Sequence, residues 1–207
     1  GRKWRAALVQ LGFLTPDQDI LDSTVGTTSP YILTPNGRRL ISGDSLQAEQ
    51  ECFLRALLAQ QIPSPIEQFQ RGVAPFNPLR IVLSTISALE SSGLEPVIRI
   101  NEMASIVQLI GDINSIEQVV EVIRTYRHEE EPYRGRDRNR FQNQIREEAA
   151  SYLQSQKADT LGDYADTNFR YLKLTGLFSE CGHGICFSAH KRTLIRQVLA
   201  SPFEVLP

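Results

Sequence analysis

The sequence predicts a mainly α-helical protein with small β-hairpins, built as winged-helix-like subdomains. Two observations support this fold class. Toward the end of the chain, an amphipathic helix runs straight into a short hairpin over 177–188, and another helix follows. A weaker form of this pattern lies near the front, over 31–41. The hydrophobic content of 41% is ordinary for a soluble fold, so 207 residues can bury one large core or two small ones.

In the front half, short apolar runs are separated by turn-forming residues. They predict helices over 4–11, 38–41 and 45–61 and a strand over 31–33. Thr34 followed by Pro35 fits an N-cap with proline in the first helical turn. Asp44, with Gln47 three residues later, fits the cap of the next helix. The segment 13–28 is rich in Asp, Thr and Gly, so we expect a loop there.

Four prolines mark the segment 62–78 as the best internal boundary. Asn77 before Pro78 then begins a helix that ends at Gly93. The later helices are predicted over 101–110, 116–127, 141–157, 160–174 and 191–200, with a strand over 97–100. The predicted domains are a winged-helix-like subdomain over 1–62, a proline-rich linker over 63–78, a second helical and winged-helix subdomain over 79–200, and a linker over 201–207.

The predicted hairpin has strands 177–180 and 185–188, joined by a four-residue loop that starts at Cys181. Together with His183 and Cys186, this cysteine raises the question of a zinc site. Zinc normally takes four ligands in two pairs, so we prefer a glycine turn flanked by cysteines and predict no metal. Three cysteines are too few for a disulfide scaffold, and a reducing cytoplasm is the default expectation.

The formal net charge of −2 argues against indiscriminate nucleic-acid binding, although it leaves room for a local basic face. No apolar run reaches the length of a membrane span, and no signal peptide is recognisable. We therefore expect a cytoplasmic protein without a membrane partner. The chain lacks an initiator methionine and ends in a linker-like segment, so we expect it to be a piece of a larger protein.

The helix predicted over 160–174 has one apolar face and one polar face. A polar outer face next to a hairpin fits a recognition helix, in which arginine can pair with guanine and asparagine with adenine. The alternative is an ordinary solvated helix face. The candidate DNA-binding residues on this helix are Thr167, Asn168, Arg170 and Lys173.

Arginines gather in and around the segment 128–140, which breaks the helical periodicity and is expected to be a loop. They suit phosphate contacts or insertion into a narrow groove. The alternative is a flexible, solvated linker neutralised by the glutamates at 129–131. The cluster comprises Arg124, Arg127, Arg134, Arg136, Arg138, Arg140 and Arg146, of which Arg134, Arg136, Arg138 and Arg140 are the candidate DNA contacts. Further candidates are Arg38 and Arg39 near the front and Lys191 and Arg192 after the hairpin.

No catalytic residue is predicted. A metal-dependent nuclease needs acidic residues and a lysine closely spaced on a strand, and no predicted strand carries that arrangement. The histidines at 128, 183 and 190 all lie near predicted loops, and no glycine-rich phosphate loop is present.

Three motifs together resemble the N-terminal recognition region of the AlwI-like type IIS restriction and nicking endonucleases. They are Thr34-x-x-Gly37-x-x-Leu40, then Asn77-Pro78-Leu79 with Val82-Leu83-Ser84, and then Ala165-Asp166-Thr167 through Arg170-Tyr171 to Thr175-Gly176-Leu177-Phe178. Their order and spacing agree over roughly residues 1 to 200. The resemblance implies that this region binds a short asymmetric DNA site, and that a separate C-terminal PD-(D/E)xK domain cuts the DNA with Mg²⁺. No base-contacting residue can be carried over, because these motifs are mostly structural.

We therefore expect the double-stranded DNA recognition portion of a type IIS restriction or nicking endonuclease from a prokaryotic cytoplasm. This portion would need no cofactor, and a second nuclease subunit is a potential partner of the full-length protein. Two alternatives stay open. A winged-helix transcription regulator would usually dimerise on a palindrome, and a winged-helix scaffold would bind proteins instead of DNA.

Overall fold

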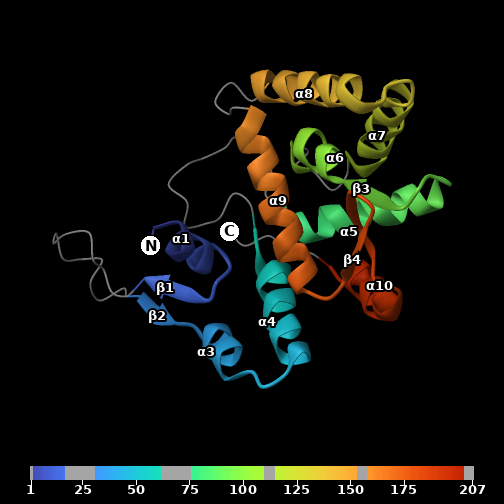
Figure 1. The fold of residues 1–207 in the computed structure, drawn as a ribbon. Coiled ribbons are helices and arrows are strands. Elements are labelled where there is room, and N and C mark those ends of the chain that lie inside the picture. Colours follow the sequence, from blue (N-terminus) through green and yellow to red (C-terminus); the bar gives the residue numbers. More distant parts are fainter. Residues whose placement is uncertain (1, 17–30, 62–75, 110–114, 153–157, 203–207) are drawn as a thin grey trace. The chain divides into compact units, whose positions relative to one another are not determined.

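The computed structural model describes residues 2–16, 31–61, 76–109, 115–152 and 158–202 (Figure 1). These residues are mainly helical and include two small antiparallel sheets, which confirms the prediction of a mainly α-helical fold with small β-hairpins. The chain divides into two compact units, Gly1–Gln60 and Gln61–Pro207. Most of the predicted proline-rich linker and most of the predicted tail linker lie outside the described residues. Within the described part, no helix is both long and apolar enough to cross a bilayer.

A two-stranded sheet and a pair of helices form most of the described first unit. Its elements are α1 (Arg2–Gln10), β1 (Leu14–Pro16), β2 (Tyr31–Leu33), α3 (Pro35–Ser42) and α4 (Leu46–Ala59). The start of the predicted loop over 13–28 is wrong, because Phe13 is buried and β1 pairs antiparallel with β2. The ring of Phe13 packs edge-on against Phe53 of α4, with 5.2 Å between centroids. The rest of that predicted loop lies outside the described residues.

Thr34 and Gly37 fix the start of α3 against the strand region. The Thr34 hydroxyl accepts a hydrogen bond from the Gly37 amide (3.0 Å) and donates to the Gly12 carbonyl (2.7 Å). A Cβ on Gly37 would lie 2.2 Å from the carbonyl oxygen of Phe13, so only glycine fits this contact. The cap predicted for the next helix is off by one residue. Ser45, and not Asp44, is the N-cap of α4, and its hydroxyl accepts from the Ala48 amide.

The second unit is larger and contains a three-stranded sheet. Its elements are α5 (Pro78–Ser91), β3 (Val97–Arg99), α6 (Ile100–Ser105), the 3₁₀ turn η1 (Val107–Leu109), α7 (Ile116–Glu130), α8 (Gly135–Tyr152), α9 (Ala158–Leu174), β4 (Phe178–Cys181), β5 (Gly184–Phe187), the 3₁₀ turn η3 (Ala189–Lys191) and α10 (Arg192–Ala200). The predicted start of α5 is confirmed, because the Asn77 side chain accepts from the Arg80 amide at 2.9 Å. Fully buried Leu79, Leu83 and Ile86 of α5 belong to the core.

The predicted hairpin is confirmed and joins a strand far away in the sequence. The sheet order is β3-β5-β4, with all neighbours antiparallel. Gly184 of β5 lies opposite Arg99 of β3, and a Cβ there would come within 2.2 Å of the Ile98 carbonyl oxygen. The hairpin loop is tighter than expected, since β4 ends at Cys181 and β5 begins at Gly184. A disulfide joins Cys181 to Cys186.

The prediction of a loop over 128–140 is wrong. α7 continues to Glu130 and α8 begins at Gly135, so a short turn alone separates the two helices (Figure 1). A cluster of charged residues indicates a solvated linker only if the charges repel one another or face water. Here a carboxylate oxygen of Glu130 lies 2.7 Å from the guanidinium of Arg138, and this pairing ties α7 to α8.

Candidate nucleic-acid interface

α9 presents a polar stripe on the side opposite its buried stripe. Leu161, Ala165, Phe169 and Leu172 are buried, which confirms the predicted amphipathic helix. This face belongs to the core, since α9 packs against α6 and α8. The exposed stripe follows the spacing i, i+3, i+4, i+7 and i+11 and consists of Asp163, Asp166, Thr167, Arg170 and Leu174. Its side chains therefore extend away from the body of the second unit.

Two of the stripe residues form an ion pair that is open to solvent. Nη2 of Arg170 lies 2.6 Å from Oδ2 of Asp166, and their side chains are 73% and 55% exposed. Thr167 is exposed too, but its hydroxyl donates to the Asp163 carbonyl at 2.8 Å. Arg170 and Asp166 thus form a solvent-exposed pair of opposite charges on the stripe.

The other two candidates on α9 make contacts inside the second unit. Asn168 is half-buried, and its Nδ2 donates to the Gln108 side chain of η1 at 3.3 Å. The Gln108 side chain in turn donates to the Leu161 carbonyl at 3.0 Å. Lys173 forms an ion pair with Glu180 of β4. Asn168 therefore helps to pack η1 on α9, and Lys173 connects the helix to the hairpin.

Most members of the predicted arginine cluster have partners within the protein. Arg124 pairs with Glu121 at 2.7 Å, and Arg140 pairs with Asp137 at 3.6 Å. Arg134 donates to the backbone carbonyls of the α7–α8 turn, and Arg146 donates to Asn143. Arg136 is exposed on α8 and has no ion pair among the described residues.

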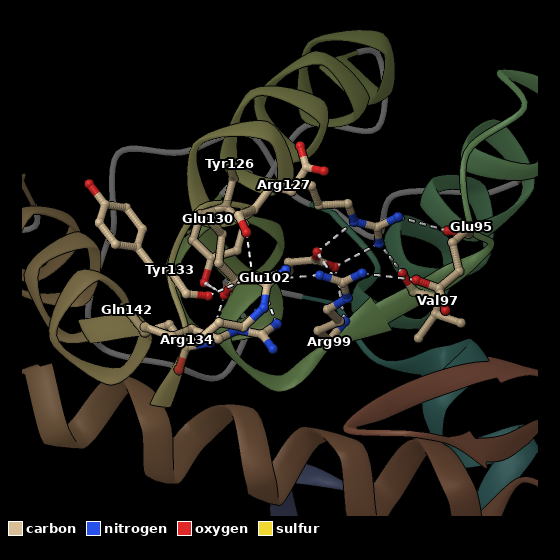
Figure 2. Close-up of polar contacts among 12 residues, drawn as sticks. Glu95, Val97, Arg99, Glu102, Tyr126, Arg127, Glu130, Tyr133, Arg134 and Gln142 are labelled. Carbon is tan, nitrogen blue, oxygen red and sulfur yellow. Dashed lines mark hydrogen bonds and ion pairs between the residues drawn. The ribbon is translucent and has the colours of Figure 1, made fainter. Parts of the chain in front are cut away.

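Figure 2 shows a group of polar contacts that joins β3, α6, α7 and α8. One centre of this group is Glu130, whose side chain is 4% exposed. Its carboxylate accepts from the Tyr126 hydroxyl (3.0 Å), Gln142 Nε2 (2.6 Å), Arg138 Nη2 (2.7 Å) and Arg99 Nη1 (3.3 Å). Four donors from three elements thus converge on one buried carboxylate.

The second centre is Glu102 of α6, whose side chain is fully buried. It accepts from Arg127 Nε at 2.7 Å and Nη2 at 3.0 Å, and from the Arg99 amide at 2.9 Å. Arg127 also donates to the carbonyls of Glu95 and Val97. The guanidinium of Arg127 is therefore committed to the interior, unlike a solvent-facing phosphate contact.

The ionisation of this group follows from its contacts. Burial alone would raise the pKa of Glu130, but hydrogen bonds from Arg138, Gln142 and Tyr126 and the charge of Arg138 lower it overall. Burial and the neighbouring Glu130 raise the pKa of Tyr126, so the phenol keeps its proton and donates. This network of ion pairs and hydrogen bonds holds β3, α6, α7 and α8 together. The i, i+4 spacing of Tyr126 with Glu130 is a sequence pattern that could have indicated a continuous α7.

The remaining candidates lie outside α8 and α9. Arg38 on α3 donates to the Leu33 carbonyl at 2.7 Å, and Arg39 is exposed on the same helix. Lys191 lies in η3. The guanidinium of Arg192 lies 5.3 Å from the ring centroid of Phe187 and 2.8 Å from a carboxylate oxygen of Glu90. The structure does not gather all predicted candidates into one patch on either unit.

Comparison with known proteins identifies a family and a related fold. No curated protein sequence matches the chain significantly. Among solved structures, one described as pyrene- and phenanthrene-modified DNA in complex with the BpuJ1 endonuclease binding domain matches with a TM-score of 0.58 and 9% sequence identity. The match covers 92% of this chain and 61% of that chain, and at this identity it establishes the fold alone. The profile of the AlwI restriction endonuclease family matches residues 9–205. Since the match spans nearly the whole sequence, the chain belongs to the AlwI restriction endonuclease family.

Proposed function

We propose that this chain recognises a short, asymmetric double-stranded DNA site as the binding region of a type IIS restriction or nicking endonuclease. The observation that carries the proposal is α9, which exposes a polar stripe and leads directly into the β4–β5 hairpin. The recognition helix of a winged-helix protein uses a polar outer face of this kind to read base edges in the major groove. Membership of the AlwI family and the shared fold with a domain described in complex with DNA support this assignment.

The topology of the second unit supports a winged-helix interpretation. Helix α5, strand β3 and helix α6 precede α9 and its hairpin, and β5 returns to pair with β3. We interpret α9 as the recognition helix and the hairpin as the wing. The pair α7–α8 is then an insertion between the second and third helices. The close packing of α6 on α9 agrees with this scheme, because a helix-turn-helix needs those two helices in contact.

The proposal divides the candidate residues by task. Exposed cations such as Arg39 and Arg136 contact phosphates and set the register, while the α9 stripe contacts bases. A net charge of −2 suits a protein that discriminates between sites more than it binds any duplex.

Cleavage belongs, in this proposal, to a PD-(D/E)xK domain outside this sequence that uses Mg²⁺, with a second nuclease subunit as a potential partner. Among the described residues, no group of three or more His, Cys, Asp or Glu side chains is placed to hold a metal ion. The whole protein would then be a site-specific deoxyribonuclease of the prokaryotic cytoplasm.

Selection of bound duplexes from a random pool tests the proposal. We expect one asymmetric consensus, bound more tightly than a scrambled duplex in fluorescence anisotropy. Arg136→Ala should weaken all duplexes alike and reduce the slope of log K against log salt by about 1. A palindromic consensus would favour a transcription regulator. No affinity for any duplex at low salt would contradict DNA recognition and favour a protein-binding scaffold.

A further inference from the structure

We infer that the Asp166–Arg170 pair on α9 reads G·C base pairs in the major groove. Arg170 donates to O6 and N7 of a guanine, and Asp166 accepts from the N4 amino group of a neighbouring cytosine. This inference rests on the proposed DNA-binding function. The inference goes further than the proposed function by naming the base edges that the exposed stripe contacts.

The charge of α9 favours base edges over phosphates. The helix carries three acidic residues, Asp159, Asp163 and Asp166, against two cations, Arg170 and Lys173. Lys173 is engaged with Glu180 of the hairpin, so the exposed stripe itself is net acidic. Phosphates repel carboxylates, and a stripe that contacted the DNA backbone would be basic. Base edges in the major groove offer amino donors, and cytosine N4 is the usual partner of Asp or Glu.

The geometry of the pair suits two simultaneous contacts. Arg170 has five N–H donors, and the 2.6 Å contact with Asp166 engages Nη2. The remaining donors face no ion-pair partner among the described residues and are available for bidentate pairing with guanine. The i, i+4 spacing also holds both side chains in one orientation before binding, which reduces the entropy lost on the duplex.

Three other arginines of the second unit are less available than Arg170. Arg138 and Arg127 are bound to the buried carboxylates, and Arg192 lies against Phe187 and Glu90. Moving Arg138 or Arg127 onto a base would leave a buried carboxylate without its donor, and moving Arg192 would break its ion pair with Glu90. Arg170 and Asp166 both stand in solvent, so they can enter a groove without breaking a buried contact.

Base analogues test the guanine contact on the duplex selected by the wild-type chain. Each guanine is replaced in turn by 7-deazaguanine, which lacks the N7 acceptor but keeps Watson–Crick pairing. We expect one position where the analogue weakens wild-type binding by about tenfold. Arg170→Ala should abolish that penalty, because the analogue then removes no contact. Arg170→Lys, which keeps the charge but not the planar pair of donors, should also lose most of it.

Asp166→Asn tests the cytosine contact. Thymine presents its O4 acceptor where cytosine presents N4, so a carboxylate should reject a C·G to T·A change. An asparagine has a donor as well as an acceptor. We therefore expect Asp166→Asn to reduce the discrimination against T·A about tenfold at one position and to leave other positions unchanged.

A matched control is Arg124→Ala, which breaks an exposed arginine–glutamate pair of the same unit on α7. This variant should keep every analogue penalty of the wild-type chain. Equal urea midpoints for all variants will show that folding is intact. If Arg170→Ala retains the 7-deazaguanine penalty, or weakens every duplex equally, Arg170 is at most a phosphate contact and the inference is overturned while DNA recognition stands. If the wild-type chain selects no duplex, the proposed function fails as well.

Discussion

Replacing Glu130 by alanine removes the carboxylate that ties α7 to α8. Four donors lose their acceptor, and they differ in access to water. The hydroxyl of Tyr126 is buried away from water, whereas Arg138, with 38% of its side chain exposed, can turn to solvent. An unsatisfied buried donor costs about 1–3 kcal/mol, and loss of one partner of a buried ion pair costs about 3–5 kcal/mol. We expect the free energy of unfolding of the Glu130→Ala variant to fall by about 3 kcal/mol, near the lower end of the ion-pair range.

Urea denaturation followed by far-ultraviolet circular dichroism measures this loss. The matched control is Glu121→Ala on the same helix, whose side chain is 63% exposed and pairs with Arg124. Its cost should stay within about 0.5 kcal/mol, as for other exposed ion pairs. If the two variants differ by less than about 1 kcal/mol, the buried carboxylate does not brace α7 and α8 and the reasoning is refuted.

A second substitution at this position, Glu130→Gln, has a defined pH dependence. The pKa of folded Glu130 lies below its ordinary value of 4.5. A carboxyl group whose pKa is lowered by folding stabilises the protein fully when the pH is above its pKa in the unfolded state. This stabilisation disappears as the pH falls through its pKa in the folded state. The difference in stability between the wild-type chain and Glu130→Gln should therefore be constant at neutral pH and shrink below 4.5. A difference that grows on acidification would contradict the direction of the shift.

Three further substitutions test local contacts. Gly184→Ala would place a Cβ 2.2 Å from the Ile98 carbonyl oxygen. It should lower the free energy of unfolding by about 2 kcal/mol or more, because β5 must move away from β3. An unchanged urea midpoint would disprove that contact. Gly37→Ala meets the Phe13 carbonyl at the same distance and should destabilise the first unit similarly, seen as earlier loss of the tertiary circular dichroism of the nearby aromatic rings. Arg80 donates to carbonyls at the end of α10 at 2.7 to 3.1 Å. Arg80→Ala should therefore lower the free energy of unfolding by about 2 kcal/mol and speed amide exchange at the end of α10. Unaltered exchange there would argue against this capping role.

Short-range patterns in the sequence were enough to predict many elements. Asn77 before Pro78 marks the start of α5, and the structure confirms the cap. The apolar spacing of α9 and the glycine turn after Cys181 predicted a helix and hairpin that the structure also contains. These features depend on contacts between residues a few positions apart, and such contacts are visible in a single sequence.

Pairing between distant segments was decided by the tertiary structure alone. Nothing near Gly184 indicates that β5 lies beside β3, because that contact depends on how the intervening helices fold back. Glu130 lies in a run of three glutamates that resembles a solvated linker. Its burial follows from donors on β3, α7 and α8, and charges that would repel in an isolated segment are neutralised once those elements meet. Local sequence therefore determined where helices and turns occur, while the identity of each charged partner depended on non-local packing.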